Sequence, residues 1–466
     1  MVERTVAGRA VMSREAEAGR DYPRIRTPLP GPRAQAIIAH DAAWSSTSYL
    51  KEYPLVIAGG RGAMVEDVDG NRYLDFMAGI AVAATGYNHP DVVRAIRDQA
   101  GKFLHICGSD FYFEGFAALA EYLARRAPGP SAKRSFLCNS GTEAIECAIK
   151  LARFHTNRPA LIAFDGGFHG RSYGALSLTS SRMRQRRRFA PFLPEVHHVP
   201  YPDPYRMGGA DAALARTMAA IKELFDRHVS PDDVAAIFVE PILGEGGYVV
   251  PPAGFLRSLR ALCDRHGILL VADEVQSGVG RTGKMWACDW EGVEPDIITM
   301  AKGLGSGMPI GAAVAKASVM TWPPGSHGST FGGNPVCCAA ALATLSIVEA
   351  MLPRVAATGQ RLLAQAQRLY EKHDSVGDVR GRGLMVGIEL VKDRRTREPD
   401  PDLMDRVIDR GFRHGLLLLG CGRSTLRIAP PLVIDDDDVD TGMAILDRCI
   451  DAETAIPERK EARHVR

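Results

Sequence analysis

Two short apolar runs that each end in an ionisable residue constrain this chain most strongly. They cover residues 268–272 and 297–301, and Asp273 and Lys302 follow them directly. Continuous apolar runs of this length, bounded by Gly or Pro, are typical of buried strands in a parallel sheet. In open α/β sheets, ligands bind beyond the carboxyl ends of such strands. We therefore expect Asp273 and Lys302 to lie in one crevice of an α/β fold.

This pairing of a carboxylate with a lysine suits pyridoxal 5'-phosphate as cofactor. A lysine amine can form a Schiff base with the cofactor aldehyde. A carboxylate beside the pyridine nitrogen keeps that nitrogen protonated, so the ring accepts electrons from a substrate carbanion. Taken singly, Asp273 is more typical of a loop cap and Lys302 of a solvated surface lysine. The surrounding motifs favour the cofactor.

These motifs resemble the signature of the class III, or omega, aminotransferases, a family that includes 4-aminobutyrate, ornithine and acetylornithine aminotransferases. The matching segments are Asp273-Glu274-Val275-Gln276, Gly278, Gly280-Arg281-Thr282-Gly283, Pro295-Asp296, Lys302-Gly303 and Pro309-Ile310-Gly311. The resemblance extends from about residue 30 to residue 450, and its motifs fall in the expected order.

The resemblance implies the fold-type I architecture of pyridoxal-phosphate-dependent transferases. This is an α/β fold with a seven-stranded, mostly parallel sheet in a large domain, and a small α+β domain built from both chain ends. It also implies an obligate homodimer with shared active sites. We predict a flexible N-terminal arm at residues 1–30, the small domain at 31–85 and 351–466, and the large cofactor-binding domain at 86–350.

A helix start that follows a short apolar strand is the candidate site for the cofactor phosphate. Ser140 and Glu143 fit a capping box. Gly141 lets the backbone approach a ligand, and free amides at a helix start form an anion site. A capping box alone is common and usually only caps a helix. Because the segment resembles the family's phosphate loop, we assign the phosphate to Ser140, Gly141 and Thr142.

Further cofactor contacts are assigned by the same resemblance. Phe168 is expected to stack on the pyridine ring, although an isolated Phe is more often a core residue, and His169 is placed beside it. Val275 is expected to pack on the opposite ring face, and Gln276 to contact the ring hydroxyl. Arg171 matches the arginine that binds the distal carboxylate in 4-aminobutyrate aminotransferases, but relatives with other substrates keep this arginine too.

The substrate end is assigned to a strand end, a turn and an arginine. Glu240 ends an apolar run, and the turn after it resembles the family's E-P-x-x-G-E-G-G loop. The resemblance implies that Glu245 pairs with the arginine that binds the substrate α-carboxylate, which matches Arg427. An arginine fork suits a carboxylate, and a surface arginine on a strand is the alternative. The family often has Gln where this chain has Leu243, which leaves polar contacts near the substrate open.

Two site residues and one helix complete the predictions. Ile80 follows a hairpin with the turn Asp69-Gly70-Asn71, and in the family the residues after this hairpin reach the active site. Thr330, in a glycine-rich loop, is expected to reach across the dimer interface to the partner's cofactor phosphate. An Ala-rich helix of about fifteen residues, over 336–350, is expected to lead out of the large domain.

The implied reaction is transamination from an ω-amino acid, such as 4-aminobutyrate, ornithine or acetylornithine, to 2-oxoglutarate. Lys302 would hold the cofactor as an internal aldimine and then act as general base. Glu245 would neutralise Arg427 for donors without an α-carboxylate and swing away for glutamate. An amino-acid racemase or epimerase would use the same lysine, and nothing in the sequence excludes it. A transcriptional regulator would need a DNA-binding module, for which the chain has no spare length.

Composition argues against other partners. Lys and Arg number 57 against 55 Asp and Glu, and the net charge of +2 makes no electrostatic case for nucleic acid or anionic membrane. The basic run at 182–188 is typical of a solvated loop, with attraction of anionic substrates as the alternative. No apolar run is expected to approach the length of a membrane span, no signal-peptide apolar core is evident, and no metal site is predicted. Nine scattered cysteines predict free thiols and a cytoplasmic enzyme.

Overall fold

The structure is a computed structural model that describes residues 22–455. Most of the predicted N-terminal arm, residues 1–21, therefore lies outside the described residues. The described end of the arm lies beside the predicted hairpin of the same chain. Arg24 forms an antiparallel bridge with Arg72, and the amide of Arg26 donates to Asn71 Oδ1 at 2.7 Å. This end of the arm is thus part of the small domain's surface.

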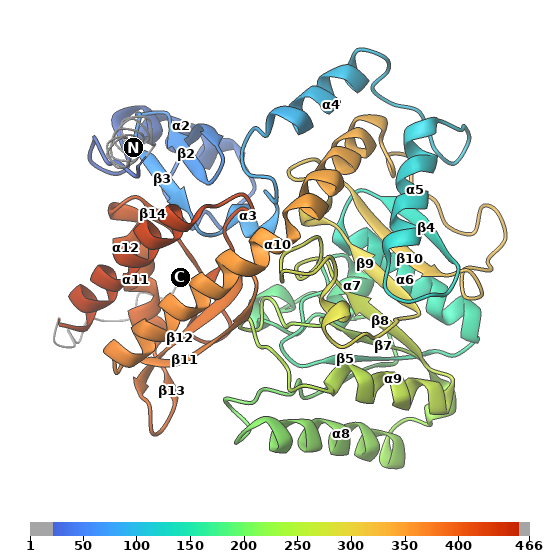
Figure 1. Cartoon of the computed structure of the whole chain (residues 1–466). Coiled ribbons are helices and arrows are strands. Elements are labelled where there is room, and N and C mark those ends of the chain that lie inside the picture. Colours follow the sequence, from blue (N-terminus) through green and yellow to red (C-terminus); the bar gives the residue numbers. More distant parts are fainter. Residues whose placement is uncertain (1–21, 456–466) are drawn as a thin grey trace, which may run out of the picture.

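A seven-stranded sheet forms the centre of the larger part of the molecule (Figure 1). In spatial order its strands are β4 (Lys133–Cys138), β10 (Gly311–Lys316), β9 (Ile297–Met300), β8 (Leu269–Asp273), β7 (Val234–Val239), β5 (Ala160–Phe164) and β6 (Val196–Val199). β10 is antiparallel to both of its neighbours, whereas β9, β8, β7, β5 and β6 pair in parallel. The predicted seven-stranded, mostly parallel sheet is confirmed.

Helices cover both faces of this sheet, and alternate residues of β5 show how. Leu161 packs in a cluster with residues of α6 (Gly141–Thr156), whereas its neighbour Ile162 packs with residues of α9 (Phe255–His266). Because side chains alternate between faces along a strand, the two helices lie on opposite sides. β5 and β7 consist only of apolar residues for the same reason. The other helices of this part are α4 (Pro90–Ala100), α5 (Glu114–Arg126), α7 (Tyr173–Leu178) and α8 (Ala210–Arg227).

Two smaller sheets combine both ends of the chain, as predicted for the small domain. One has the order β1 (Ile57–Arg61), β2 (Met64–Asp67), β3 (Arg72–Asp75) and β14 (Leu416–Leu417). The other has the order β11 (Val376–Arg382), β12 (Met385–Asp393), β16 (Thr425–Ile428) and β15 (Leu419–Cys421), with β13 (Glu398–Pro399) beside β12. The parallel pairing of β14 with β3 joins the C-terminal segment to the predicted hairpin. The helices here are α2 (Pro32–Trp44), α3 (Ala78–Ala81), α11 (Pro401–Arg413) and α12 (Asp436–Thr454).

One long helix connects the two parts. α10 spans Pro335–Lys372, 38 residues, and crosses the molecule in Figure 1. The prediction of a helix of about fifteen residues that ends at residue 350 is wrong. Pro353 lies inside the helix and removes one backbone hydrogen bond there. The helix continues because it is buried on both sides of the proline, at Val348 before it and at Val355 after it.

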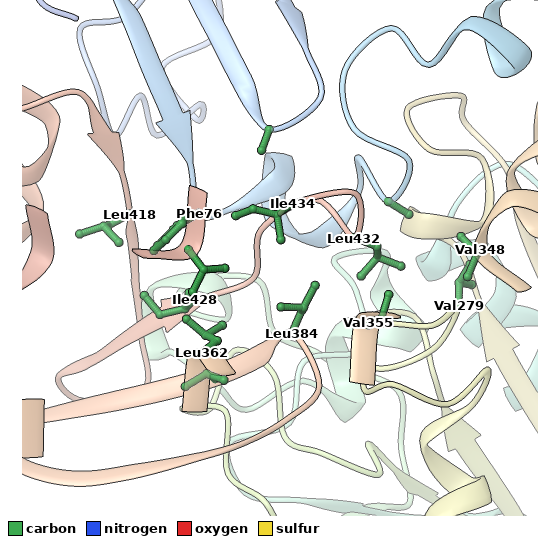
Figure 2. Packing of buried hydrophobic residues seen from close by; sticks show 14 of the residues in the cluster. Phe76, Val279, Val348, Val355, Leu362, Leu384, Leu418, Ile428, Leu432 and Ile434 are labelled. Atoms are coloured by element: carbon green, nitrogen blue, oxygen red, sulfur yellow. The ribbon is translucent and has the colours of Figure 1, made fainter. Parts of the chain in front are cut away.

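The largest apolar cluster ties α10 to the C-terminal strands and to the end of the hairpin. Figure 2 shows Leu362 of α10 near Ile428 of β16, and Phe76 near Leu418. Val279 and Leu432 belong to the same cluster and are almost fully buried. The cluster therefore continues from the small domain into the loop that follows β8.

Two predictions from composition have different outcomes. All nine cysteines, which lie within the described residues, are free. However, α10 is long and apolar enough to cross a membrane by length and composition, with mean hydropathy 1.9 in its most apolar window. The expectation that no run approaches a membrane span is therefore wrong for this helix. Its side chains at Cys338 and Leu345 are buried in the core, as in the core helix of a globular protein.

Candidate active site

The two ionisable residues that end the apolar runs lie at the ends of neighbouring strands. β8 and β9 are parallel and adjacent, and Asp273, the last residue of β8, pairs in register with Thr299 of β9. Lys302 follows β9 with a φ of +46°. A non-glycine residue in this left-handed region is uncommon, and such strain clusters at functional sites. The predicted meeting of an acid and a lysine at one sheet edge is thus present in the fold.

A cavity of about 410 Å³ opens at this edge of the sheet. Most of the predicted site residues line it, and they come from the ends of several strands and from the start of α6. They are Ser140, Gly141, Thr142, Phe168, His169, Arg171, Glu240, Asp273, Val275, Gln276 and Lys302.

Asp273 is held by three donors in the floor of the cavity. His169 Nδ1 lies 2.7 Å from Asp273 Oδ2, and both residues are buried. Thr299 Oγ1 donates to Asp273 Oδ1 at 3.2 Å, and the amide of Val275 donates to the same oxygen at 3.1 Å. Burial alone would lower the pKa of His169, but the hydrogen bond and the charge of Asp273 outweigh it and raise that pKa. The carboxylate is therefore fixed in orientation.

Glu240 holds two loops of the cavity together. Its Oε1 accepts from the amide of Phe168, and its Oε2 accepts from the amide of Gly244, both at 2.9 Å. Burial raises the pKa of Glu240 to about 7, since the nearby charge of His169 and these two amides offset the loss of water only in part. This carboxyl group thus positions the aromatic ring of Phe168 and the turn that carries Glu245.

The start of α6 is the capped helix terminus that the sequence predicts. Ser140 caps the helix, and its Oγ accepts from the amide of Glu143 at 3.4 Å. The predicted capping box is wrong in its second half, because the carboxylate of Glu143 accepts from the amide of Asn139 and not from that of Ser140. A Cβ atom on Gly141 would lie 2.9 Å from Val275 Cγ1. Only glycine lets the helix start lie this close to the loop after β8.

Lys302 lies in a setting that favours the neutral amine. Desolvation lowers the pKa of Lys302, and the negative charges of Glu245, Glu240 and Asp273 counter this only in part. A lysine with a lowered pKa is a better nucleophile and base near neutral pH.

A buried ion pair joins the turn after β7 to strand β16. Arg427 Nη1 donates to Glu245 Oε1, and the arginine is 6% exposed. Burial alone would raise the pKa of Glu245, but Arg427 and Lys302 lower it overall. Glu245 in turn raises the pKa of Arg427 above its usual value, although burial alone would lower it. The predicted pairing of Glu245 with Arg427 is thus present in the structure.

The residues present fit pyridoxal phosphate. Gln276 Oε1 is buried and has no hydrogen-bond partner among the described residues, so it can accept from the ring hydroxyl of the cofactor. Asp273 can face the pyridine nitrogen, Lys302 supplies the amine, and the first amides of α6 can take the phosphate.

Four predicted residues do not line the cavity: the paired Glu245 and Arg427, and Ile80 and Thr330. Ile80 is 39% exposed and has a φ of +69°, within a left-handed turn that runs from Ala78 to Ala81. Thr330 is exposed in its loop. Neither residue lines the cavity in the single chain, and their roles stay predictions.

The cavity also has lining residues that the sequence analysis did not assign to the site. They are Val82, Asn139, Gly170, Ala301, Gly307, Met308, Pro309 and Ile310. Several of them directly adjoin residues that were assigned, so adjacency to the motifs was a usable signal. Val82 has no such signal, because the left-handed turn before it brings it to the cavity.

A separate cluster of polar side chains lies on the small domain. His373, Asp447 and Asp451 place their ligand atoms within 4.8 Å of one another. Lys372 Nζ occupies the same group of carboxylates, at 2.8 Å from Asp447 and 2.6 Å from Asp451. A lysine ammonium already supplies the positive charge here, so the cluster is an ion-pair network.

The fold and the cavity define a pyridoxal-phosphate-dependent enzyme of fold type I. The family described as Aminotransferase class-III matches residues 46–450. The chain therefore belongs to the class-III aminotransferases, and it is a pyridoxal-phosphate-dependent aminotransferase.

Several relatives are similar over nearly their whole length. The 4-aminobutyrate aminotransferase of Mycobacterium tuberculosis (strain ATCC 25618 / H37Rv) is 42% identical over 435 residues, covering 91% of this chain and 97% of that protein. The acetylornithine aminotransferase of Methanopyrus kandleri is 44% identical and covers 84% and 94%. The alanine/serine racemase of Pyrococcus horikoshii is 39% identical and covers 94% and 95%.

Solved structures agree with the fold. An amine transaminase from an uncultivated Pseudomonas species, in its PLP-bound form, has a TM-score of 0.81 at 32% identity and covers 88% of this chain and 97% of that chain. The omega transaminase of Pseudomonas jessenii in complex with PMP has a TM-score of 0.84 at 29% identity and covers 89% and 98%.

Proposed function

We propose that this aminotransferase moves an amino group from an ω-amino acid, such as 4-aminobutyrate, ornithine or acetylornithine, to 2-oxoglutarate. The observation that carries the proposal is the arrangement of cations around Lys302. Arg171 lies at the cavity with no ion pair among the described residues, whereas Arg427 is paired with Glu245. One arginine is thus ready for a carboxylate, and the other becomes ready only when Glu245 moves.

This arrangement suits two substrates of different charge. An ω-amino donor has no carboxylate on the carbon whose amine reacts, so it needs one cation, which Arg171 supplies, while Glu245 neutralises Arg427. 2-Oxoglutarate has two carboxylates and needs both arginines, so it must displace Glu245. Arginine binds carboxylates through a planar fork of donors, which gives both sites geometric specificity.

The cavity residues have separate tasks in the reaction. Pyridoxal phosphate, when bound, supplies an aldehyde that links to the amine and a ring that accepts the electrons of the adjacent carbon. Lys302 Nζ holds the cofactor and then takes the proton from the donor carbon that carries the amine. Asp273 keeps a proton at the pyridine nitrogen, and His169 orients Asp273. Phe168 and Val275 enclose the ring, and Gln276 accepts from its hydroxyl.

Ser140, Gly141 and Thr142 are proposed to bind the phosphate. Thr330 is proposed to reach across a homodimer interface to the partner's cofactor phosphate, and its exposure in the single chain supports this. Ile80 is proposed to reach the active site. The predicted domain limits, with the small domain at 31–85 and 351–466 around a large domain at 86–350, are kept as a proposal. α10 runs continuously across residue 350. The nine free thiols support a reducing, cytoplasmic location.

The test follows the absorbance of the bound cofactor in single half-reactions. The purified enzyme is mixed with ω-amino acids, and with L- and D-α-amino acids, in the absence of any keto acid. Conversion of the cofactor band by an ω-amino acid, and its recovery with 2-oxoglutarate, supports the proposal. Conversion by α-amino acids alone contradicts it.

A racemase or epimerase is the second candidate, and the similarity to the alanine/serine racemase of Pyrococcus horikoshii favours it. Such an enzyme needs the same lysine but returns the proton to the substrate carbon. Its signature in the same experiment is a persistent cofactor band while an α-amino acid loses optical purity.

A further inference from the structure

The turn that carries Glu245 lies against one face of the small-domain sheet. Gly422 donates its amide to the carbonyl of Glu245 at 2.8 Å. The turn is closed by mutual backbone bonds between Leu243 and Val249, at 3.0 and 3.1 Å. Its far end, Gly247, meets the side chain of Arg380, whose Nε and Nη2 donate to the carbonyl of Gly247 at 3.1 and 2.6 Å.

Arg380 and Arg427 lie in one row across this sheet. Arg380 of β11 pairs with Gly387 of β12, and Gly387 pairs with Arg427 of β16. Directly opposed residues in antiparallel strands point to the same face. A Cβ atom on Gly387 would lie 3.0 Å from Tyr248 Cβ. The glycine between the two arginines therefore gives the turn room to lie on the sheet.

Arg380 also contacts the strand that carries Arg427. Its Nη2 donates to Thr425 Oγ1 at 3.1 Å. Thr425 and Arg427 are two residues apart on β16 and so share a face. One guanidinium thus joins the backbone of the Glu245 turn to the strand of Arg427, which are the two halves of the buried ion pair.

Arg380 is already neutralised, unlike a substrate-binding arginine. Its Nη1 lies 2.6 Å from Asp378 Oδ2 and 2.8 Å from Glu389 Oε2. Despite burial, these two carboxylates raise the pKa of Arg380 above its usual value. The positive charge of Arg380 is therefore already compensated and does not serve a substrate carboxylate. Its remaining N–H groups donate to Gly247 and Thr425.

We propose that Arg380 is a positioning residue that clamps the Glu245 turn to the strand of Arg427, so that only the Glu245 side chain moves when a dicarboxylate binds. The inference rests on the proposed function, because it concerns the exchange between a monocarboxylate donor and 2-oxoglutarate. Strand β16 is held by ladders on both sides, from β12 and β15. Loss of the clamp would therefore loosen the turn more than the strand.

The test substitution is Arg380→Lys in the cofactor-loaded enzyme. Lysine keeps the charge between Asp378 and Glu389 but cannot reach Gly247 and Thr425 together with a planar fork. Glu245 then neutralises Arg427 for less of the time. We expect the half-reaction with 4-aminobutyrate to slow roughly tenfold, the effect of one hydrogen bond to a charged group. The half-reaction with 2-oxoglutarate should stay unchanged or become faster, because Glu245 is displaced more easily.

A second readout does not depend on activity. Calorimetry measures the binding of glutarate, a dicarboxylate without an amine or keto group, and of pentanoate, its monocarboxylate counterpart. The ratio of glutarate to pentanoate affinity should rise in Arg380→Lys. Equal changes of both affinities, or equal slowing of both half-reactions, would overturn the inference.

Arg394→Lys is the matched control. Arg394 also donates to backbone carbonyls, to Val376 at 2.8 Å and His373 at 2.6 Å, but away from the Glu245 turn. It should leave the ratio of half-reactions unchanged. If Arg380→Lys does not fold, Thr425→Val removes one of the acceptors that the Arg380 guanidinium binds. This variant should shift the ratio of the two half-reactions in the same direction. An unshifted ratio rejects the clamp. A wild-type enzyme that does not use ω-amino acids with 2-oxoglutarate rejects the proposed function instead.

Discussion

His169 Nδ1 and Asp273 Oδ2 form a buried hydrogen bond of 2.7 Å beneath the cavity. The bond joins the loop after β5 to the end of β8. The neighbour of His169, Phe168, is in turn held by Glu240 through its backbone amide. The acid at the end of β8 and the aromatic ring after β5 are therefore positioned by one connected set of hydrogen bonds, and the cavity has a preorganised floor.

Replacement of Lys302 by arginine should abolish the half-reaction with any donor. Arginine stays protonated and cannot act as a base or form the cofactor linkage. Loss of a general base costs about 10²–10⁴-fold in rate, so we expect a fall of at least about 10³-fold, measured from cofactor absorbance in single turnovers.

Lys316→Arg is the control for that substitution. Lys316 is also on the sheet but pairs with Asp296, at 2.8 Å. It should keep the wild-type rate. A Lys302→Arg enzyme with more than a tenth of the wild-type rate would contradict the role given to Lys302.

Replacement of Glu245 by alanine should separate the two half-reactions. The change leaves Arg427 buried without its partner, so a donor with one carboxylate meets an uncompensated cation. We expect the 4-aminobutyrate half-reaction to slow by about 10-fold or more, and the 2-oxoglutarate half-reaction to change much less. Stopped-flow absorbance measures both.

Asp440→Ala removes an exposed partner of Arg361 and serves as the matched control. It should affect neither half-reaction, because exposed ion pairs contribute little. Equal slowing of both half-reactions by Glu245→Ala would mean that no carboxylate exchange takes place at Arg427.

Replacement of Gly141 by alanine should weaken cofactor binding. The new Cβ would lie 2.9 Å from Val275 Cγ1 and force the start of α6 away from the loop after β8. We expect the dissociation constant of pyridoxal phosphate to rise by about tenfold, since a crowded contact costs about 1–3 kcal/mol. Equilibrium dialysis measures this constant.

Gly59→Ala is the control for Gly141→Ala, because a Cβ atom there meets nothing within 4 Å. It should leave cofactor affinity unchanged. Unaltered affinity in Gly141→Ala would mean that the phosphate does not bind at the start of α6.

Replacement of Glu240 by glutamine should change how stability depends on pH. The folded pKa of Glu240 is about 7, above the ordinary value of 4.5. The stability that the protonated carboxyl contributes is therefore fully present below pH 4.5 and is lost as the pH rises through 7. Glutamine does not titrate. The free energy of unfolding of the variant therefore rises relative to that of the wild type over this pH range, by up to about 3 kcal/mol.

Denaturant unfolding of the cofactor-free protein at pH 5 and pH 8 measures this gain. Glutamine also loses one of the two amide acceptors, which adds a constant offset but no slope. Glu371→Gln, at an exposed position, is the control and should show no slope. A pH-independent difference between Glu240→Gln and the wild type would show that Glu240 stays ionised in the fold.

The sequence predicts the parts of the site that are local. Asp273 and Lys302 could be placed because apolar runs mark buried strands and their ends mark the ligand edge. The start of α6 could be placed because Ser140 caps it within three residues. These features depend on residues that are close together in the sequence, so the local sequence pattern is enough to predict them.

Other features depend on contacts between distant segments and could not be predicted in this way. α10 continues through Pro353 because tertiary burial outweighs the lost hydrogen bond. The carboxylate of Glu143 turns to the amide of Asn139, a choice that the capping pattern does not specify. The contact of Arg380 with Gly247 joins residues 133 positions apart. Sequence spacing contains no signal for it.

The transfer of nitrogen from donor to acceptor tests the central claim most directly. The enzyme is incubated with ¹⁵N-labelled 4-aminobutyrate, then with ¹⁵N-labelled ornithine and acetylornithine, each with unlabelled 2-oxoglutarate, and glutamate is analysed by mass spectrometry. The account predicts ¹⁵N-glutamate, formed in an amount equal to the donor consumed. Glutamate without label for every ω-amino donor, together with loss of optical purity in an α-amino acid, would contradict it.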